Sequence, residues 1–406
     1  MTTTKNNKDK KLNVPNLRFP EFEGEWEVES IKDVADFMGG GTPSSSNESF
    51  WQGTIPWVSS SDIVENDIKN ISISRYITEE AIAHSATKLC PAPSILIVSR
   101  VGVGKIALSK EAICTSQDFC NLINIKVEPI FLTYCLSQIM KRKSMEVQGT
   151  SIKGITTSEI QKISINIPSL QEQKKIGKIL SLLDERIATQ NKIIDKLQSL
   201  IKGLNDTLYA QHGDEVMTSF AELGTSYSGL SGKSAQDFGS GKPFITYLNV
   251  YSNNVINENE FQYVAIKDGE KQNIVEYGDV LFTLSSETPN EVGIGSVFLG
   301  KEKVYLNSFC FGIHITNKEV AFPPFLSYYV SSTAFRKFIY PFAQGSTRFN
   351  LCKADFEKAS IKLPTLENQK RIYSILSHID SKIETEKHML DLYNSQKQYL
   401  LRQMFI

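Results

Sequence analysis

Residues 148–187 read QGTSIKGITTSEIQKISINIPSLQEQKKIGKILSLLDERI, and residues 344–383 read QGSTRFNLCKADFEKASIKLPTLENQKRIYSILSHIDSKI. The two stretches align without a gap at a spacing of 196 residues. Identical pairs include Gln148/Gln344, Gly149/Gly345, Pro168/Pro364, Leu170/Leu366, Gln173/Gln369, Lys174/Lys370, Ile179/Ile375, Leu180/Leu376 and Asp184/Asp380. A repeat at fixed spacing defines the architecture before any local pattern does. It predicts a tandem duplication of a domain followed by a long helix.

The repeat continues upstream in a weaker form. RVGVGKIAL (100–108) corresponds to EVGIGSVFL (291–299), FLTYCLS (131–137) to FLSYYVS (325–331), and IPWV (55–58) more faintly to KPFI (242–245). The spacing drifts between 187 and 196 residues, which indicates small loop insertions. We therefore predict an N-terminal tail (1–23), a first domain (24–168), a first spacer helix (169–213), a second domain (214–364) and a second spacer helix (365–406). Domains of this size are ordinary.

Both predicted spacer helices carry an apolar stripe with alternating steps of four and three residues, as in a coiled-coil seam. Its members are Ile176, Leu180, Leu183, Ile187, Ile194 and Leu197 in the first helix, and Ile372, Leu376, Ile379, Ile383 and Leu390 in the second. A polar residue, Gln190 or Glu386, interrupts both stripes at the same step. Such a stripe also fits packing on the chain's own domain, or pairing with a second copy of the chain. Because one chain carries both stripes, high effective concentration favours pairing within the chain, and the order of the repeats favours an antiparallel pair.

Each helix also has a start signal. Pro168-Ser169 and Pro364-Thr365 place a hydroxyl N-cap after a proline, with Glu172 or Asn368 three residues later. A helix of about 40 residues spans about 60 Å, so the pair is expected to act as a rod.

The segments between the helices predict an α+β fold. Short β-branched and aromatic runs, punctuated by Gly, Ser and Asn, predict strands near 94–100, 104–109, 120–127, 279–285, 295–300 and 311–316. Residues 131–143 and 324–340 are predicted to be helical. Between these elements lie polar loops at 39–49, 58–62 and 226–241. Such loops are often flexible connectors, but loops held on a rigid scaffold are also common recognition sites.

The charge is nearly balanced, which argues against a strongly basic nucleic-acid binder. Each predicted domain has 13 basic and 16 acidic residues, and the whole chain has a formal net charge of −1. Any phosphate-binding surface must therefore be a local patch. The best candidates are the duplicated basic pairs Arg142-Lys143 and Arg336-Lys337. On charge alone, a solvated helix end is the favoured explanation of these pairs.

The sequence contains no convincing catalytic motif. Gly102-Val103-Gly104-Lys105 resembles the end of a phosphate loop, but Ile106 stands where a Ser or Thr is required. Phe322-Pro323-Pro324-Phe325 resembles a methyltransferase signature, but Phe322 cannot accept a hydrogen bond from a target amine. The five histidines show no metal-ligand spacing. We therefore expect no catalytic residue, no metal and no cofactor on this chain.

Composition also indicates a cytoplasmic protein. No apolar run approaches the roughly 20 residues of a membrane span, and the polar N-terminus does not resemble a secretory signal. The six cysteines show no CxxC spacing and are expected to be reduced and mostly buried.

Several of these segments together resemble the specificity subunit of Type I restriction-modification systems. They are VPNLRFPEFEGEWE (14–27), GGGTPS (39–44), FWQGTIPWVSSSDI (50–63), QGTSIKGIT (148–156) and the duplicated helical element IPSLQEQKKIGKILSLLDERI (167–187). The resemblance covers nearly the whole chain. It implies two target-recognition domains that each read one half of a bipartite double-stranded DNA site. The antiparallel helices would set the gap and help dock two methyltransferase subunits, and restriction subunits would join through that complex. The methyl donor and nucleotide would bind to those partner subunits.

Base recognition requires side chains with suitable donors and acceptors. In the first domain the candidate DNA contacts are Thr42, Ser44, Ser59, Ser61, Arg100, Lys105, Gln117, Asp118, Gln148 and Lys153, besides Arg142 and Lys143. In the second domain they are Tyr227, Lys233, Tyr247, Asn249, Ser285, Ser286, Asn307, Gln344, Thr347 and Arg348, besides Arg336 and Lys337. The second copy lacks the GGGTP string, which fits two domains that read different bases.

Two other functions fit the same architecture. A structural adaptor would carry two β-rich protein-binding domains on a coiled-coil rod, and an enzyme fragment would have lost its methylase region. A neighbouring gene with a methyl-donor loop would favour the DNA-reading function. The target sequence itself is not encoded in any residue-to-base code that can be read from this chain.

Overall fold

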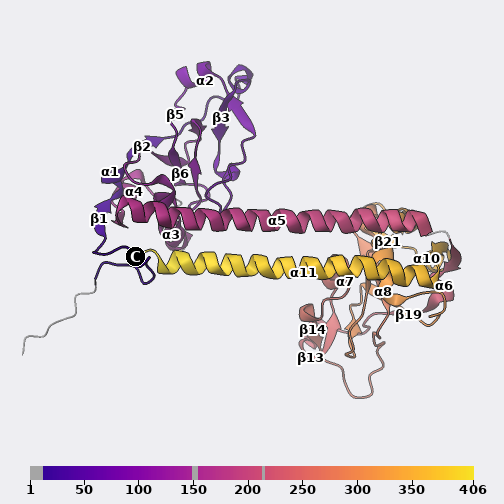
Figure 1. Ribbon diagram of the computed structural model, residues 1–406. Coiled ribbons are helices and arrows are strands. Elements are labelled where there is room, and N and C mark those ends of the chain that lie inside the picture. Colours follow the sequence, from indigo (N-terminus) through magenta and orange to yellow (C-terminus); the bar gives the residue numbers. More distant parts are fainter. Residues whose placement is uncertain (1–11, 149–153, 213–214) are drawn as a thin grey trace, which may run out of the picture. The chain divides into compact units, whose positions relative to one another are not determined.

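The computed structural model describes residues 12–148, 154–212 and 215–406. The chain forms two compact units, Met1–Gln190 with Met389–Ile406, and Asn191–His388, which we call unit 1 and unit 2. Each unit contains one β-rich domain and a part of both long helices, α5 (Leu170–His212) and α11 (Leu366–Gln403) (Figure 1). The α+β fold class is confirmed. The border between the two units falls inside both long helices, so it does not test the predicted boundaries between domains and helices. Those boundaries stay a prediction.

The described part of unit 1 contains two four-stranded sheets and a two-stranded ribbon. The antiparallel sheet has the order β2 (Asp36–Gly39), β9 (Phe119–Ile123), β6 (Ser94–Val98), β7 (Ile106–Ser109). The mixed sheet has the order β4 (Arg75–Ile77), β3 (Ile55–Val58), β8 (Ile113–Thr115), β5 (Leu89–Cys90), and β1 (Glu27–Ser30) pairs with β10 (Ser164–Ile167). The domain helices are α1 (Ile31–Val34), α2 (Glu79–Ala83), α3 (Pro129–Gln148) and α4 (Thr157–Gln161), with 3-10 turns η1 (Glu48–Trp51) and η2 (Ser60–Asp62).

Unit 2 repeats this plan. Its antiparallel sheet has the order β12 (Gly224–Ser228), β19 (Cys310–Ile315), β15 (Val280–Thr283), β17 (Gly295–Val297). The mixed sheet has the order β14 (Gln262–Val264), β13 (Phe238–Ile245), β18 (Tyr305–Leu306), and β11 (Val216–Ser219) pairs with β22 (Ser360–Leu363). A further sheet joins β16 (Ser285–Ser286), β21 (Phe349–Leu351) and β20 (Ala343–Gln344). The helices are α6 (Phe220–Leu223), α7 (Tyr247–Ser252), α8 (Pro323–Tyr329), α9 (Thr333–Ile339) and α10 (Lys353–Lys358), with 3-10 turns η3 (Ala235–Asp237), η4 (Glu258–Glu260), η5 (Pro289–Glu291) and η6 (Tyr340–Phe342).

Strand pairing confirms the faint correspondence between IPWV and KPFI. Trp57 of β3 pairs in parallel with Cys114, and Phe244 of β13 pairs in parallel with Tyr305. Both strands also pair in antiparallel fashion on their other edge, with β4 and β14. The predicted helix at 324–340 is divided into α8 and α9, because Ser332 caps a new helix by accepting a 3.1 Å hydrogen bond from the Phe335 amide.

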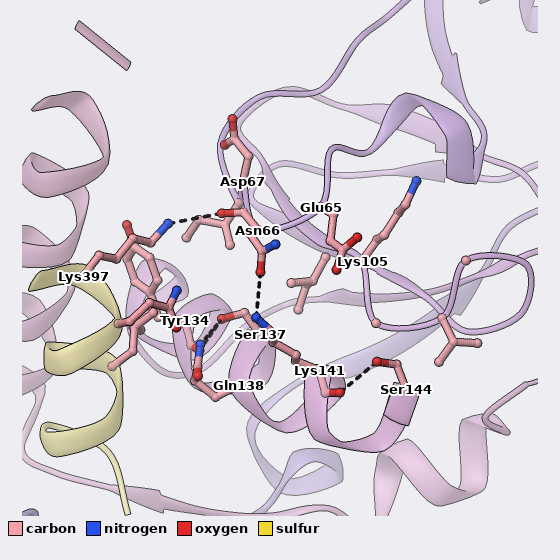
Figure 2. A pocket seen from close by; sticks show the side chains of 17 residues that line it. Glu65, Asn66, Asp67, Lys105, Tyr134, Ser137, Gln138, Lys141, Ser144 and Lys397 are labelled. Carbon is pink, nitrogen blue, oxygen red and sulfur yellow. Dashed lines mark hydrogen bonds between the residues drawn. The ribbon is translucent and has the colours of Figure 1, made fainter. Parts of the chain in front are cut away.

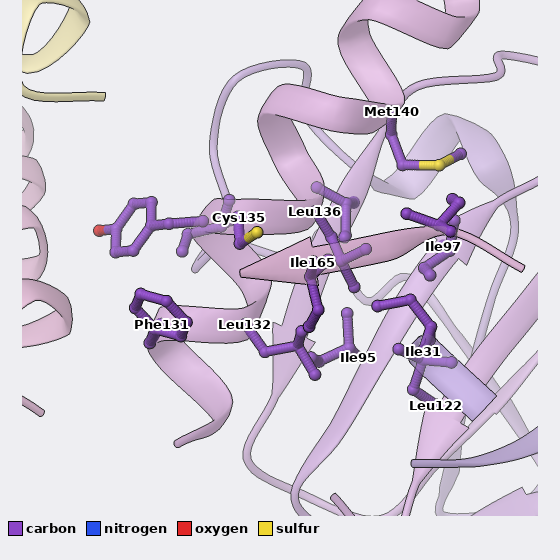
Figure 3. Close-up of a cluster of buried hydrophobic side chains, with 14 of the residues drawn as sticks. Ile31, Ile95, Ile97, Leu122, Phe131, Leu132, Cys135, Leu136, Met140 and Ile165 are labelled. Carbon is purple, nitrogen blue, oxygen red and sulfur yellow. The ribbon is translucent and has the colours of Figure 1, made fainter. Parts of the chain in front are cut away.

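The core of unit 1 explains the uninterrupted apolar sequence of β6. Ile95 and Ile97 face the apolar side of α3 and pack in one cluster with Leu132 and Leu136 (Figure 3). The alternate residues, including Leu96, pack into a second cluster on the other face of the sheet. Since β6 is covered on both faces, it has no polar alternation. The corresponding cluster of unit 2 is rich in Phe side chains in stacked and edge-to-face contact.

Two conserved positions of the repeat attach each long helix to its own domain. Tyr134 donates a 2.6 Å hydrogen bond to Asp184, and Tyr328 donates the equivalent bond to Asp380. The Gln173 amide donates to the Pro168 carbonyl at 2.8 Å and accepts from the Glu128 amide at 2.9 Å. Gln369 makes both bonds in the same way, to Pro364 and from Phe322. The identical residues of the repeat therefore form a duplicated joint between domain and helix.

The predicted helix starts are confirmed, but the N-terminal side chains make different contacts. The hydroxyls of Ser169 and Thr365 accept long 3.4 Å hydrogen bonds from the amides three residues ahead. The side chains at those positions do not complete a capping box. Glu172 instead binds the Arg18 guanidinium at 2.8 Å and 2.9 Å, and Asn368 donates to Glu215 at 2.9 Å.

The long helices pair within both units. In unit 1 the first part of α5 contacts the last part of α11, where Lys397 forms a 2.6 Å ion pair with Asp184 and Arg186 donates to the Tyr393 hydroxyl. In unit 2 the last part of α5, including Ile201, packs into the core cluster that contains Ile372 from the start of α11. The two helices therefore run antiparallel, as predicted.

Burial along the predicted stripe separates two kinds of contact. Ile176, Leu180, Ile372 and Leu376 are at most 2% exposed and belong to the cores of the domains. These positions fit the alternative of packing on the chain's own domain. Ile194 and Ile383 are buried too, whereas Leu183, Ile187, Leu197, Ile379 and Leu390 are half-buried. Half-burial is expected for a seam between only two helices.

Candidate nucleic-acid interface

In each domain, segments far apart in the sequence meet at one end of the antiparallel sheet. In unit 1 the Ile155 amide donates to the Ser99 carbonyl at 2.7 Å, directly after β6. In unit 2 the Leu351 amide donates to the Leu284 carbonyl at 2.8 Å, directly after β15. Ile155 and Leu351 correspond to each other in the repeat, and each therefore lies at the end of the equivalent strand of its own copy. We call these two strand ends the loop ends of the domains.

At the loop end of unit 1, three serines follow β3 and are fixed by charged neighbours. Arg75 donates 2.6 Å hydrogen bonds to the Ser59 hydroxyl and to Asp62. Lys105 donates to the Ser60 carbonyl at 3.1 Å. Burial acts to raise the pKa of Asp62, but hydrogen bonds from Ser59 and Arg75 lower it overall. The charged carboxylate therefore holds the serine turn in place.

The glycine-rich loop at 39–49 is built against tryptophans. Trp57 donates a 2.9 Å hydrogen bond to the Gly41 carbonyl, and Trp51 donates to the Ser44 carbonyl at 3.1 Å. Thr42 donates to the side chain of Gln117, and both residues are exposed. A Cβ on Gly41 would lie 2.4 Å from the Ala86 backbone, so the close approach requires glycine. This loop is thus a fitted part of the surface rather than a free connector.

The loop end of unit 2 forms an open groove of about 710 Å³. We call it the unit 2 groove, and it is lined by Tyr247, Leu248, Tyr251, Ser285, Ser286, Glu287, Glu291, Thr347 and Arg348. Tyr247 donates to the Ser285 carbonyl at 2.8 Å and stacks on Tyr251 with a ring separation of 6.0 Å. Five of the predicted contact residues therefore line one concave surface. They are Tyr247, Ser285, Ser286, Thr347 and Arg348.

Most other predicted DNA contacts are accessible. Thr42, Ser44, Ser61, Arg100, Gln117, Arg142, Lys337 and Gln344 are exposed, and Ser59, Lys105, Asp118, Lys143 and Asn307 are partly exposed. Arg142 and Lys143 lie within α3 rather than at its end, and Lys337 lies in α9. Gln148 is the last residue of α3, and Lys153 lies outside the described residues.

Four predicted contacts have internal partners that do not support a direct DNA contact. Tyr227 is 8% exposed and donates to buried Asp279 at 2.6 Å, and Asn249 is fully buried and donates to the Asn257 carbonyl at 2.9 Å. Lys233 is bound by the Ala265 carbonyl and by Glu270. Arg336 donates to the carbonyls of Asn290, Val292 and Gly293. Sequence pattern alone does not separate such internal polar residues from surface ones.

The structure adds site residues that sequence reasoning missed. Arg75 lies over the Trp57 ring at 4.5 Å, and nothing in its local sequence marks it. Tyr251, Glu287 and Glu291 line the unit 2 groove. Tyr251 follows Tyr247 by four residues, the spacing of neighbours on one helix face, and this signal was available in the sequence.

Unit 1 also contains a polar pocket of about 200 Å³ between α3, the turn at 65–68 and the last turns of α11 (Figure 2). Three lysines that line this pocket donate hydrogen bonds to other residues of unit 1. Lys397 donates to the Asn66 carbonyl at 3.2 Å, and Lys141 donates to the Asn66 side chain at 3.3 Å. Lys105 reaches the Ser60 carbonyl. The hydrogen bond from Lys397 therefore connects the turn at 65–68 of the domain to α11.

Two features of the described part of the chain concern its possible chemistry, the metal-ligating side chains and the thiols. Its Asp, Glu, His and Cys side chains form no cluster able to hold a metal ion. The five buried thiols are Cys90, Cys114, Cys120, Cys135 and Cys310. Burial raises the pKa of Cys90 to about 11 and that of Cys135 to about 12, so these thiols are poor nucleophiles. None of the described helices is long and apolar enough to cross a membrane.

Comparison with known protein families identifies the family of this chain. The family described as "Type I restriction modification DNA specificity domain" matches residues 23–199 and 228–392. The chain belongs to this family. The two matched stretches cover both loop ends and reach into both long helices, so the sequence resemblance to specificity subunits is confirmed.

Relatives with known names support the same assignment. The MjaIX specificity subunit of Methanocaldococcus jannaschii is 33% identical over 43% of this chain and 42% of its own length. The EcoR124I/EcoR124II specificity subunit of Escherichia coli is 35% identical over 41% of this chain and 43% of its own length. The matched regions thus span less than half of these two curated relatives. A putative MjaX specificity subunit from M. jannaschii is 25% identical over 93% of this chain and 92% of its own length.

Solved structures show that the fold of this specificity-domain chain is known. A Type I restriction-modification S subunit from M. genitalium has a TM-score of 0.56 at 16% identity, and covers 97% of this chain and 99% of that chain. A structure from work on complex assembly and conformational transition of the type I system has a TM-score of 0.58 at 16% identity, and covers 93% of this chain and 96% of that chain.

Proposed function

We propose that this chain is the DNA-reading subunit of a Type I restriction-modification complex, in which each domain reads one half of a bipartite target. One observation carries the proposal. The same framework occurs in both units, where the end of a central strand is bonded to the corresponding repeat residue, Ile155 or Leu351, but the polar side chains around it differ. Unit 1 presents Ser59, Ser61 and Arg100, and unit 2 presents Tyr247, Thr347 and Arg348. A duplicated frame with different side chains suits two readers of different sequences.

The charges indicate that DNA binding needs partner subunits. Each predicted domain carries three more acidic than basic residues. Since phosphate contacts supply most non-specific affinity, this chain alone offers little of it. Arg100, Arg142 and Lys337 are exposed, so each can serve as a local phosphate contact. The subunits of the complex supply the remaining phosphate contacts.

The long helices provide the surface for those partners. Their outer faces expose Leu182, Leu200, Leu392 and Tyr399 by 47% to 54%. Exposed apolar side chains rimmed by charge are typical of docking surfaces. We propose that two methyltransferase subunits dock here and that restriction subunits join through them. The helices also set the gap between half-sites.

Catalysis belongs to the partner subunits, which bind the methyl donor and the nucleotide. We therefore expect the purified chain to incorporate no methyl groups into duplex DNA and to cleave none. Incubation with methyl donor and duplex measures this directly, with the co-expressed complex as positive control. Reproducible turnover by the isolated chain would show that it contains a catalytic centre.

Methylome sequencing of a strain with and without this gene tests the proposed function. We expect one bipartite motif to lose methylation when the gene is removed and to regain it when the gene is restored. An electrophoretic shift with the co-expressed methyltransferase should show the same sequence preference. An unchanged methylome, with no DNA binding by the complex, would instead favour a protein-binding adaptor.

A further inference from the structure

We infer that Arg348 reads a guanine base in the half-site bound by the second domain. This inference rests on the proposed function and concerns the unit 2 groove. Arg348 lies between β20 and β21, where the chain turns at Gly345. Gly345 has a φ of +138°, and a Cβ there would lie 2.1 Å from the Arg348 carbonyl oxygen. Only glycine fits this turn, so the backbone of Arg348 has a fixed position beside the groove.

The guanidinium is oriented but not saturated. Its Nη2 donates a 3.2 Å hydrogen bond to the Ser285 hydroxyl, and it lies 6.0 Å from the centre of the exposed Phe309 ring. No further hydrogen bond to Arg348 occurs among the described residues. A guanidinium has five N–H donors. Most of them are therefore available to a ligand in the groove.

The second predicted domain offers little choice of arginine. Residues 214–364 contain two arginines, Arg336 and Arg348. Arg336 donates to three backbone carbonyls and braces the turn at 290–293. The bidentate recognition of guanine O6 and N7 is a task for which arginine is the preferred side chain. If this domain reads a guanine in that way, the contact falls to Arg348.

The acidic residues of the same groove favour a base edge over a phosphate. Glu291 accepts hydrogen bonds from Tyr251, Ser286 and Thr288, and the bond from Tyr251 is the main cause that lowers the pKa of Glu291. Glu287 lines the groove and is exposed. Two carboxylates repel a phosphate, whereas a carboxylate can accept from cytosine N4. The groove thus presents donors and acceptors in the combination that a G·C pair requires.

The contact should be specific to the second half-site. The aligned residue in the first copy is Ile152, which cannot donate to guanine and which lies outside the described residues. Base recognition in the first domain must therefore use other side chains.

The test uses the complex of this chain with its co-expressed methyltransferase and duplexes that contain the mapped motif. Each guanine of the second half-site is replaced in turn by 7-deazaguanine, which lacks the N7 acceptor. We expect the native complex to bind one such duplex at least about 5-fold more weakly, since a bidentate contact contributes about 1 to 3 kcal/mol. The Arg348→Ala complex should show no additional loss at that position.

Lys318→Ala is the matched control, because this substitution also removes one positive charge. Lys318 is exposed and follows the end of β19 that lies away from the unit 2 groove. It should keep the native sensitivity to 7-deazaguanine. Ser285→Ala removes the partner of Arg348 and should weaken the effect at the same base. The inference is overturned if the native complex is insensitive at every guanine of the second half-site, or if Arg348→Ala keeps the same sensitivity. Absence of any bipartite methylation would instead refute the proposed function.

Discussion

Asp184 and Asp380 occupy equivalent positions of the repeat, but their surroundings differ. Each accepts a hydrogen bond from a tyrosine of its own domain. Asp184 also forms a 2.6 Å ion pair with Lys397, and both side chains are about nine-tenths buried. On the repeat spacing, the residue that corresponds to Lys397 is Ile201. Burial is accordingly the main cause that raises the pKa of Asp380.

This difference predicts opposite effects of the same substitution. Asp184→Asn leaves the Lys397 cation without its buried partner and should destabilise the protein by about 3 to 5 kcal/mol. Asp380→Asn keeps an acceptor for Tyr328 and removes a poorly solvated charge, so it should be neutral or stabilising at pH 7. Denaturant unfolding of both variants measures the free energies. Equal losses of stability would show that the ion pair contributes nothing.

The same reasoning gives a pH dependence. A carboxyl group whose pKa is raised by folding stabilises the fold below its unfolded value, near 3.8, and loses that contribution as pH rises through the folded value. The native protein should therefore lose stability relative to Asp380→Asn as pH rises above about 4. A constant difference across this range would contradict the shift.

Sequence reasoning at this scale identified the repeated residues but not their roles. Gln173 was visible as an identical residue, but its function depends on the Glu128 amide, 45 residues away. The internal partners of Tyr227 and Asn249 could not be predicted for the same reason, since these partners come together only on folding. The residues of the unit 2 groove were easier to predict, because polar side chains in loops after buried strands often reach the surface.

At the scale of elements, the helices were predictable and the sheet order was not. The apolar stripe and the proline-hydroxyl starts locate the first residues of α5 and α11 to within one residue, whereas α11 ends three residues before the predicted end. The strand β6 was evident from its apolar run, but its neighbours β9 and β7 are chosen by pairings that no local pattern encodes. The stripe pattern also did not distinguish residues that pair the helices from residues that pack on a domain. Ile176 and Leu180 belong to the domain core.

The half-buried seam gives a matched pair of substitutions. Leu183→Asp places a charge on the seam in unit 1 and should destabilise the protein by several kcal/mol. Thr189→Asp, at an exposed position of the same helix outside the seam and the proposed docking residues, should change stability by less than about 0.5 kcal/mol. Ile379→Asp tests the equivalent position of α11, and both seam variants should abolish assembly with the methyltransferase. Unchanged assembly would show that helix pairing is dispensable.

At the scale of the whole molecule, the duplication predicts two separable readers. Replacing residues 24–168 by the corresponding domain of a related specificity subunit should change one half of the methylated motif. The other half and the gap should stay as they were, because the second loop end and both long helices are retained. Methylation mapping of the chimaera measures this. A change in both halves would mean that the domains do not read independently.

The long helices should act as the ruler between the half-sites. One heptad added to each helix, after Ile194 and after Leu390, keeps the seam in register and lengthens the pair by about 10 Å, close to three base pairs of about 3.4 Å each. Three base pairs also rotate one half-site by about 100° relative to the other, given about 10 to 10.5 base pairs per turn. We therefore expect either a gap longer by about one to three base pairs or a loss of activity, with unchanged half-site sequences. Methylation of the original motif at full activity would mean that the distance is set elsewhere, by the partner subunits or by the DNA itself.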